Sequence, residues 1–389
     1  MNVLMVSNGF GEAAIAGSIA RAIVARSPGA AVDHAPLVGS LPADTWPPAV
    51  GPRARMPSGG LVTYGNVRNL LGDLRAGLAR LTLAQFRFLS AQRCRDVVVA
   101  VGDVFCAGAC VVFARRPTVF VATAKSQYVA PHSRIECAIA RRARVTFARD
   151  EPTARALRWR GVNARWVGNA MMDELKERSC PLPSAHGMLS IGVLAGSRAD
   201  AIPNAVRALR RLRLIAARGV RGHHGVRALF ALAPSVDAAA LMHALSSDGI
   251  ALRPTGARSG IVAAGAQGSL EVAIVAGCLP AVLEQSSLVL GQAGTGNEQA
   301  AGAGRPVVAA MESGEHAGRM GWYRMRQQKL LGDALLVLPQ DDERFVRGVV
   351  TLLEDPARMN AMARVGRERM GPPGACAAIA NTVIATAGS

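Results

Sequence analysis

The chain has 389 residues, of which 50% are hydrophobic, 19% charged and 4% aromatic. This length favours two domains, each large enough to bury a core of its own. The apolar composition excludes a disordered chain. Seven scattered cysteines without a CxxC pair exclude a small disulfide scaffold and a structural zinc site.

No segment has the length and composition of a membrane span. Three glutamates, Glu271, Glu284 and Glu298, interrupt the apolar region between Gly260 and Gly304, well before the ~20 residues that a span requires. The first residues lack the cationic start and the cleavage site of a secretory signal. We expect a cytoplasmic protein, with peripheral association at the inner face of the membrane as an additional option.

The formal net charge is +18, and all but three of the 45 basic residues are arginine. The arginines are spread along the chain with few aromatic residues among them, which is not typical of a nucleic-acid stacking platform. We therefore expect no specific nucleic-acid partner. The charge is typical of an arginine-rich solvated surface, and it also fits an anionic membrane surface or a phosphate-bearing substrate.

In the first half of the chain, short apolar runs alternate with helix-length stretches. Strands are predicted at residues 2–7, 96–102, 117–123, 144–149 and 164–169. Helices are predicted at 12–26 and at 67–92, where leucines recur at the spacing of one helical face, at Leu70, Leu71, Leu74, Leu78 and Leu81. This alternation predicts a parallel sheet with helices on both faces.

The pattern starts again after a proline-rich break at residues 179–184. Further strands are predicted at residues 189–196, 228–234, 287–292, 306–311 and 334–339, and helical stretches run from about Asp341 to the end. No short-period repeat is visible. We therefore predict two α/β halves of similar size, joined near residue 180.

Ligands of open α/β sheets bind beyond the carboxyl ends of the strands, and four predicted loops lie there. The first, SNGFGE (7–12), has glycines that let its backbone approach a ligand closely. The helix N-terminus behind this loop favours anions. The alternative is a tight strand-to-helix turn in which Glu12 complements the helix dipole.

The second and third loops each carry one charged candidate. Asp103 comes directly after a run of valines, where a carboxylate can be a general base or simply the N-cap of the next helix. The third loop, TAKSQY (123–128), carries Lys125, one of only three lysines, beside Ser126. A compact ammonium group suits phosphate chemistry, although Lys125 can equally be a surface residue.

The fourth loop, within residues 291–306, joins a strand to a helix through Gly294, Thr295 and Gly296. Its backbone amides and the helix N-terminus can hold a diphosphate. Glu298 has the wrong charge for phosphate, which indicates that it accepts hydrogen bonds from sugar hydroxyls. Arg198, at the first turn of the same half, can supply a guanidinium fork to the diphosphate.

Several other catalytic signatures are absent from the sequence. No two aspartates lie two residues apart, so the Asp-x-Asp pattern of metal-dependent sugar transferases is missing. The chain also lacks a GxSxG nucleophile elbow and a GxxxxGK[ST] loop. The pair His223 and His224 has no acidic neighbour that would complete a metal site.

Six stretches of the chain match a known pattern in order and spacing. They are SNGFGE (7–12), VGDVF (101–105), TAKSQY (123–128), VGNAMMD (167–173), LAGSRADAI (194–202) and AGTGNEQAAGAGRPVV (293–308). Over nearly its whole length the chain resembles the two-domain GT-B glycosyltransferases, specifically lipid-A-disaccharide synthase and bacterial proteins related to it. The resemblance implies an α/β fold of two Rossmann-like domains, with parallel sheets facing across a cleft.

The resemblance implies a division of labour along the chain. Residues 1–178 would form the acceptor-side domain, residues 187–370 the nucleotide-sugar domain, and residues 371–389 a helix that packs back toward the N-terminal domain. The implied activity is transfer of a sugar, of the N-acetylglucosamine type, from a UDP-sugar to a hydroxyl acceptor. No metal cofactor is expected. A lipid or cell-envelope precursor at the inner face of the membrane is a candidate acceptor, and no oligomeric state is implied.

The resemblance also assigns roles to residues. Asp103, or alternatively Glu12, would deprotonate the acceptor hydroxyl, and Glu298 would bind the ribose hydroxyls. The expected nucleotide-sugar residues are Ser197, Arg198, Gly294, Thr295, Gly296, Asn297, Glu298 and Gln299. The expected acceptor and sugar loops contain Asn8, Gly9, Gly11, Lys125 and Ser126.

The chain departs from the resembled pattern mainly on the acceptor side. Phe10 and Ala13 stand where related proteins carry a histidine and an aspartate. Gln127, in the third loop, stands where they carry an aspartate. The donor-side loop is closer to the pattern, so nucleotide-sugar binding is the firmer expectation.

Two other functions stay open on the sequence alone. A UDP-sugar epimerase or hydrolase on the same fold would consume the nucleotide sugar without any acceptor. A non-catalytic basic scaffold would bind anionic lipid or nucleic acid with a steep salt dependence. The loop Gly-Thr-Gly-Asn-Glu (294–298) argues against the scaffold, because a scaffold has no need of a glycine cradle beside an acid.

Overall fold

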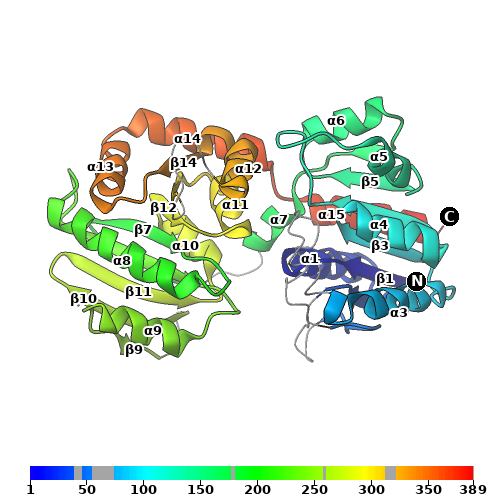
Figure 1. Ribbon diagram of the computed structural model, residues 1–389, viewed down its shortest axis with the longest axis horizontal. Coiled ribbons are helices and arrows are strands. Elements are labelled where there is room, and N and C mark those ends of the chain that lie inside the picture. The colour runs from blue at the N-terminus through cyan, green and yellow to red at the C-terminus, as the bar shows by residue number, and fades with distance from the viewer. Residues whose placement is uncertain (39–45, 55–73, 177–179, 257–259, 312–320, 389) are drawn as a thin grey trace. The chain divides into compact units, whose positions relative to one another are not determined.

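The computed structural model describes residues 1–38, 46–54, 74–176, 180–256, 260–311 and 321–388. The chain divides into two compact units. Unit 1 comprises Met1–Glu174 together with Pro372–Ser389, and unit 2 comprises Leu175–Gly371. Each unit is an α/β structure with its own sheet and its own buried core (Figure 1).

The described part of unit 1 has a six-stranded, fully parallel sheet in the order β2-β1-β3-β4-β5-β6. Its strands are β1 (Asn2–Ser7), β2 (Ala31–Pro36), β3 (Val97–Gly102), β4 (Thr118–Ala122), β5 (Val145–Ala148) and β6 (Ala164–Arg165). Its helices are α1 (Phe10–Arg26), α3 (Leu78–Ser90), α4 (Val104–Ala109), α5 (Arg134–Ala140), α6 (Glu151–Trp159), α7 (Ala170–Asp173) and α15 (Ala375–Ala387). Strand β3 is buried at every residue, as expected for a valine run covered on both faces.

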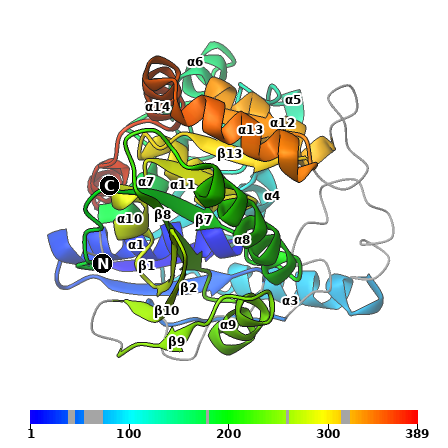
Figure 2. The same cartoon turned by 90° about the vertical axis from the view of Figure 1, so that its left-hand side faces the viewer.

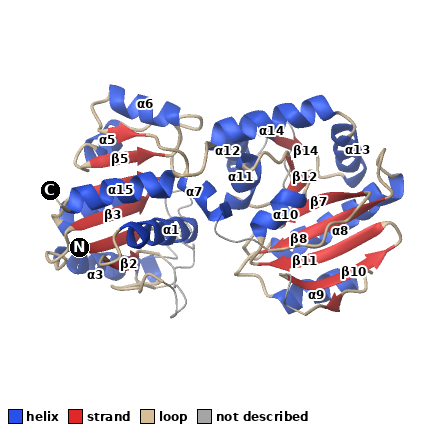
Figure 3. Cartoon of the chain, turned by 180° about the vertical axis from the view of Figure 1, so that it is seen from behind, coloured by secondary structure: helices blue, strands red, loops and turns tan. Residues whose placement is uncertain are grey.

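Helices cover both faces of the unit 1 sheet (Figure 3). On one face the C-terminal helix α15 packs along α1 and also touches α7 and β3. Both helices are rich in alanine, so their backbones can approach closely while Ile19 of α1 and Ile379 of α15 remain fully buried. The last residues of the chain therefore complete the core of unit 1.

The described part of unit 2 has an eight-stranded sheet in the order β14-β13-β12-β7-β8-β11-β10-β9. Of these strands, Figure 2 labels β7, β8, β9, β10 and β13. Its strands are β7 (Met188–Leu194), β8 (Gly225–Leu232), β9 (Arg253–Pro254), β10 (Ile261–Gln267), β11 (Leu270–Ala276), β12 (Leu288–Gly291), β13 (Val307–Ala310) and β14 (Leu335–Leu338). Its helices are α8 (Ala201–Arg218), α9 (Ala238–Ser247), α10 (Leu279–Gln285), α11 (Thr295–Gly302), α12 (Trp322–Leu331), α13 (Asp342–Leu353) and α14 (Pro356–Met370).

The edge formed by β9, β10 and β11 is the main departure from the expected parallel sheet. Strand β10 runs antiparallel to both β11 and β9. Gly268, with a φ of +59°, and Ser269 form the two-residue turn between β10 and β11, a geometry that glycine adopts without strain. After Ile261 and Val262 the sequence of β10 is mostly alanine and glycine, which have little preference for a strand, and this hairpin was not predicted.

Two expected elements differ in extent from the prediction. The strand predicted at residues 164–169 is only the two-residue β6. The helix predicted at 67–92 includes α3, but residues 67–73, with Leu70 and Leu71, lie outside the described part. Leu74, expected on the apolar face, is 45% exposed.

Two further features of the described residues bear on the environment of the protein. A disulfide joins Cys180 to Cys278 within unit 2, a pairing that the scattered cysteine spacing did not indicate. None of the described helices combines the length and the apolar composition needed to cross a bilayer.

One buried histidine lies just behind the end of β1. Nε2 of His34 lies 2.8 Å from the hydroxyl of Ser7, and the imidazole is 1% exposed. Burial lowers the pKa of His34 from 6.5 to about 4, because the charged imidazolium cannot be solvated there. His34 is therefore neutral in the folded protein at neutral pH.

We predict that acidification destabilises unit 1 through His34. Between pH 4 and 6.5 the unfolded chain binds more protons at this residue than the folded chain, so the free energy of unfolding falls as the pH drops. The expected loss between pH 7 and pH 5 is about 2 kcal/mol. Urea denaturation of the wild type and of His34→Gln at both pH values measures it. The prediction fails if both proteins lose the same unfolding free energy.

Candidate functional site

The strand order places an open crevice at the carboxyl edge of each sheet. In unit 1 the chain goes from β1 to β2 on one side of it and then crosses to β3 on the other side. In unit 2 the strands β8 and β12 flank β7 in the same way. Helices diverge at such switch points, and ligands of open α/β sheets bind there. Of the four loops that the sequence singled out, those after β1, β3 and β12 leave strands at these points, and the loop after β7 carries Ser197 and Arg198.

In unit 1 the loops after β1 and β3 meet. The backbone N–H of Asp103 points at Oδ1 of Asn8, at 3.4 Å. Gly102 has a φ of +145° and lies against the Asn8 side chain, where a Cβ would collide with it. The carboxylate of Asp103 accepts a hydrogen bond of 3.0 Å from the N–H of Cys106 and caps α4. Asp103 thus fulfils the capping role that its position allowed, and its other carboxylate oxygen is not used by this cap.

Glu12 lies over the same crevice from the first turn of α1. Its carboxylate folds back against Gly9, where a side chain would collide with it. The hydroxyl of Thr123, at the end of β4, approaches Oε1 of Glu12 at 3.5 Å. Gly11 lies within α1 itself. The structure therefore brings Asn8, Glu12 and Asp103 to one switch point.

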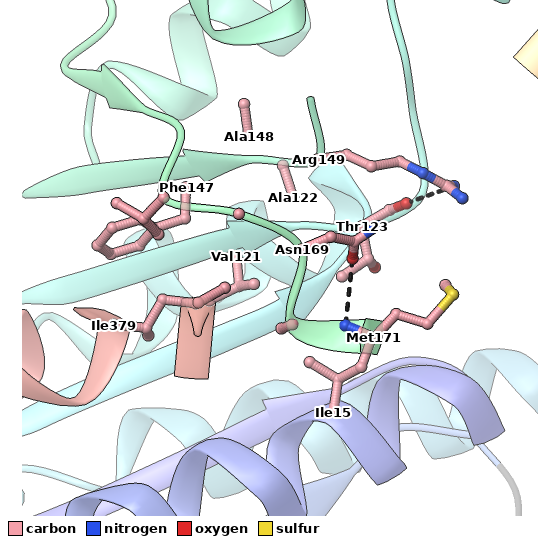
Figure 4. A pocket seen from close by; sticks show the side chains of 14 residues that line it. Ile15, Val121, Ala122, Thr123, Phe147, Ala148, Arg149, Asn169, Met171 and Ile379 are labelled. Atoms are coloured by element: carbon pink, nitrogen blue, oxygen red, sulfur yellow. Dashed lines mark hydrogen bonds between the residues drawn. The ribbon is translucent and has the colours of Figure 1, made fainter. Parts of the chain in front are cut away.

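Arg149 also reaches this edge of unit 1, and sequence reasoning missed it. Its guanidinium donates a hydrogen bond of 2.9 Å to the carbonyl of Thr123 (Figure 4). These two residues line a small cavity together with Asn169, whose side chain caps α7. The cavity has a volume of about 20 Å³, which is enough for a water molecule but not for a sugar. This cavity is therefore not a sugar site.

The third predicted loop has a structural role in the described residues. Nζ of Lys125 lies 2.8 and 3.0 Å from the two carboxylate oxygens of Glu136, which also forms the capping box of α5 with Ser133. Although burial alone would raise the pKa of Glu136, the hydrogen bonds from Lys125 and Ser133 lower it. Ser126 is buried, and its hydroxyl accepts the N–H of Tyr128. Lys125 thus fastens α5 to this loop.

In unit 2 the loops after β7 and β12 leave adjacent strands. The N–H of Gln292 donates a hydrogen bond of 2.8 Å to the carbonyl of Leu194, which holds the two loop bases together. Ser197 and Arg198 are exposed in the loop after β7. Thr295 is exposed at the start of α11. In this first turn the N–H groups of Asn297 and Glu298 donate to the carbonyl of Gly294, at 3.1 and 3.4 Å, whereas those of Thr295 and Gly296 precede the helical hydrogen-bond ladder. Glu298 lies half-buried in the same turn.

A buried polar network stands behind the loop after β12. Arg324 of α12 is 1% exposed and donates to the side-chain oxygens of Gln327, at 2.7 Å, and of Gln292. Gln327 in turn donates to the carbonyls of Ala293, at 2.9 Å, and Gly294, at 3.3 Å. A buried guanidinium is costly unless it is hydrogen-bonded, so this network fixes the loop from behind.

One of the expected nucleotide-sugar residues belongs to this network. Asn297 is fully buried, and its amide donates to the carbonyl of Gly291, at 3.1 Å, and to Gln327, at 3.2 Å. Gln299 is also buried. Thr295 is exposed, and Gly296 and Glu298 are half-buried, so these three are the more accessible residues of the first helical turn.

Arg324 and Gln327 carried no recognisable sequence signal. They lie about thirty residues beyond the loop that they support, on a helix without a clear apolar face. Arg149 had a weak signal, because it directly follows a strand. The described residues contain no group of three or more histidine, cysteine, aspartate or glutamate side chains that could hold a metal ion.

Comparison with known proteins identifies the fold. No protein-family model and no curated protein matches the chain, but solved structures match it over nearly its full length. UDP-GlcNAc 2-epimerase from Neisseria meningitidis, bound to UDP-GlcNAc, is 14% identical with a TM-score of 0.56, covering 99% of both chains. The corresponding enzyme from Methanocaldococcus jannaschii is 13% identical with a TM-score of 0.56, covering 99% of this chain and 100% of the other.

A glycosyltransferase is equally similar in structure. The spinosyn rhamnosyltransferase complexed with thymidine diphosphate is 15% identical with a TM-score of 0.58, covering 99% of this chain and 100% of the other. The chain therefore has the two-domain α/β fold of GT-B type that these enzymes share, and the predicted fold class is confirmed. At these identities the likeness concerns the fold alone.

We predict that Gln327→Ala destabilises unit 2 by about 2 kcal/mol. The substitution removes the donor to the carbonyls of Ala293 and Gly294. It also removes an acceptor of Arg324 and an acceptor of Asn297. Urea denaturation measures the change. Gln328→Ala is the matched control, since Gln328 is the neighbouring half-buried glutamine outside the network. Equal unfolding free energies of the two variants would contradict a supporting role for Gln327.

Proposed function

We propose that the chain acts on a nucleoside diphosphate sugar, which it binds at the loop between β12 and α11. The observation that carries this proposal is the buried network of Arg324 and Gln327, which holds the carbonyls of Ala293 and Gly294 from behind. A loop that is fixed on its inner side presents the amides of the first helical turn outward in a constant geometry. Such amides at a helix N-terminus bind phosphate oxygens.

Each outer residue of this loop has a role in the proposal. The amides of Thr295 and Gly296 bind the diphosphate, and Arg198, exposed at the end of the neighbouring strand, adds a guanidinium to it. Glu298 accepts hydrogen bonds from the ribose hydroxyls, since a carboxylate is an acceptor only. Ser197 lies beside Arg198 and can donate its hydroxyl to a phosphate oxygen.

The reaction we propose first is glycosyl transfer from a UDP-sugar, of the N-acetylglucosamine type, to a hydroxyl acceptor. The acceptor oxygen bonds to the anomeric carbon as the bond from that carbon to the diphosphate breaks. The acceptor proton passes to Asp103, or alternatively to Glu12, and the bonding electrons leave with UDP. The N-terminus of α11 stabilises the charge of the departing diphosphate, and such stabilisation is worth about 2.7–4 kcal/mol per donor in enzymes.

The resemblance to lipid-A-disaccharide synthase supports a lipid or cell-envelope acceptor for this transfer. The net charge of +18 is consistent with it, because a basic protein is attracted to an anionic membrane surface. In this proposal the protein associates peripherally with the inner face of the membrane while it binds its acceptor.

Epimerisation of the UDP-sugar is the second candidate. The observation that favours it is the number of UDP-GlcNAc 2-epimerases among the similar structures, two of which are described as bound to UDP-GlcNAc. An epimerase needs the nucleotide-sugar loop but no acceptor. The two candidates therefore differ in what they consume when no acceptor is supplied.

We predict that Glu298→Gln weakens the binding of UDP at least tenfold, because a neutral amide replaces the acceptor of the ribose hydroxyls. Calorimetric titration with UDP and with UDP-GlcNAc measures the affinity. Glu354→Gln, an exposed glutamate at the end of α13, is the control and should bind like the wild type. If neither nucleotide binds the wild type, the proposed donor site is wrong.

We predict that Asp103→Asn lowers turnover about 10²–10⁴-fold while stability and UDP affinity stay unchanged. Asparagine caps helices as well as aspartate does, but it cannot act as a general base. Nuclear magnetic resonance of UDP-GlcNAc incubated with the wild type, with and without candidate acceptors, follows the products. Conversion of UDP-GlcNAc without acceptor would favour epimerisation or hydrolysis, and conversion only with acceptor would favour transfer.

A further inference from the structure

Helix α6 of unit 1 presents one continuous face to a cavity. The residues of this face recur at helical spacing along α6 and its C-cap, and they are Pro152, Arg155, Ala156, Trp159 and Arg160. The opposite wall is formed by Gln127 and His132, from the loop after β4. None of these residues belongs to the switch point of either sheet.

This cavity is much larger than the two cavities at the carboxyl edges of the sheets. Its volume is about 460 Å³, against about 20 Å³ for the cavity beside Thr123 and for the cavity under the β12 loop. Small-molecule sites in proteins are typically about 300–1,000 Å³. The space therefore suits a compound of the size of a sugar phosphate.

The lining combines positive charge with an exposed aromatic ring. Arg155 and Arg160 bring two guanidinium groups, and no carboxylate is among the lining residues. Trp159, one helical turn from Arg155, is 86% exposed. A single exposed apolar residue needs no explanation, but here the indole lies at the rim of a cavity beside two cations. Guanidinium groups bind phosphate oxygens in pairs, and an indole face packs against a flat ring.

The walls of the cavity are fixed by internal contacts. The N–H of Gln127 donates to Thr153 of α6 at 2.8 Å, and Thr153 is in turn held by the Asp150 cap. Arg160 donates to the carbonyl of His132. Burial lowers the pKa of His132, which is 9% exposed, so that wall is neutral at neutral pH. A cavity with fixed walls loses little conformational entropy when a ligand binds.

We propose that this cavity binds a phosphate ester carried on a ring, with the phosphate between Arg155 and Arg160 and the ring against Trp159. The same chemistry occurs in a free hexose phosphate and in the headgroup of a lipid such as phosphatidylinositol. The inference does not rest on the proposed nucleotide-sugar function, because every residue of the cavity lies in unit 1 and none lies in the β12 loop.

The first experiment titrates the full-length protein with glucose 6-phosphate, glucose and inorganic phosphate by calorimetry. We expect glucose 6-phosphate to bind at least tenfold more tightly than either fragment, because only it fills both subsites. Arg155→Gln and Trp159→Ala should each weaken its binding about tenfold. Both residues are exposed on the surface of a helix, so both variants should fold.

The control variant is Arg142→Gln, which removes one exposed arginine of the same unit outside the cavity. It should bind glucose 6-phosphate like the wild type. Sedimentation with phosphatidylcholine vesicles, with and without phosphatidylinositol, tests the lipid source in the same four proteins. Binding that needs phosphatidylinositol and is lost in Arg155→Gln and Trp159→Ala would identify the lipid headgroup as the ligand.

Two outcomes would overturn the proposal. One is no binding of either glucose 6-phosphate or phosphatidylinositol vesicles to the wild type. The other is equal weakening in Arg142→Gln and Arg155→Gln, which would show attraction to the overall charge only. UDP titration of the wild type and of Arg155→Gln separates the two proposals. Arg155→Gln should bind UDP like the wild type. If the wild type does not bind UDP, the proposed site at the β12 loop is wrong and the proposal for the cavity is unaffected.

Discussion

The carboxyl edge of a parallel sheet is the constraint on which the rest of this structure depends. In a parallel sheet the loops that follow the strands all lie at one edge. The strand order reverses between β1 and β3 in unit 1 and between β7 and β12 in unit 2. At these points the helices lie on opposite faces of the sheet and do not cover the edge. Asn8 and Asp103 meet in unit 1 for this reason, although 95 residues separate them. Leu194 and Gln292 are adjacent in unit 2 for the same reason. The candidate functional residues therefore lie at two points of the fold, and the strand order alone determines where these points are.

The two switch points differ in how their loops are supported. In unit 2 the buried guanidinium of Arg324 donates hydrogen bonds to the side chains of Gln292 and Gln327. Gln327 also donates to the carbonyls of two loop residues. Burying the guanidinium of Arg324 costs free energy. The hydrogen bonds that offset this cost form only while the loop keeps its shape. The network therefore couples the stability of unit 2 to the geometry of the loop. In unit 1 the loop after β1 has Ser7 held from behind by His34, at 2.8 Å, while Asn8 approaches the N–H of Asp103 at 3.4 Å and Glu12 approaches the hydroxyl of Thr123 at 3.5 Å.

Much of the fold was predictable because its strands are short apolar runs between helix-length stretches, and β3, β7 and β12 are where their valine and leucine runs predict them. The hairpin of β10 and β11 was not predicted. Most of β10 is alanine and glycine, which have little preference for a strand, and the apolar run of β11 does not stand out within the apolar region between Gly260 and Gly304. The site was predictable where a residue directly follows a strand, as Asp103 does. It was not predictable for Arg324 and Gln327, since a contact between positions thirty residues apart depends on how α12 packs. The ion pair of Lys125 with Glu136 was not predictable either, since Glu136 lies on a helix whose position the sequence does not reveal.

Packing also explains one departure of the chain from the pattern that it resembles. Ala13, which stands where related proteins carry an aspartate, is 8% exposed in α1, and a carboxylate at this position would lose its hydration against the sheet. Ala13 therefore fits the core of unit 1, and this position provides no carboxylate near the crevice. Asp103 and Glu12 are the two carboxylates that contact the described residues of this crevice. Since Asp103 also caps α4, a base at this position would be held in a constant orientation by the helix that it begins. Proton transfer in this chain, if it takes place in unit 1, accordingly falls to one of these two groups.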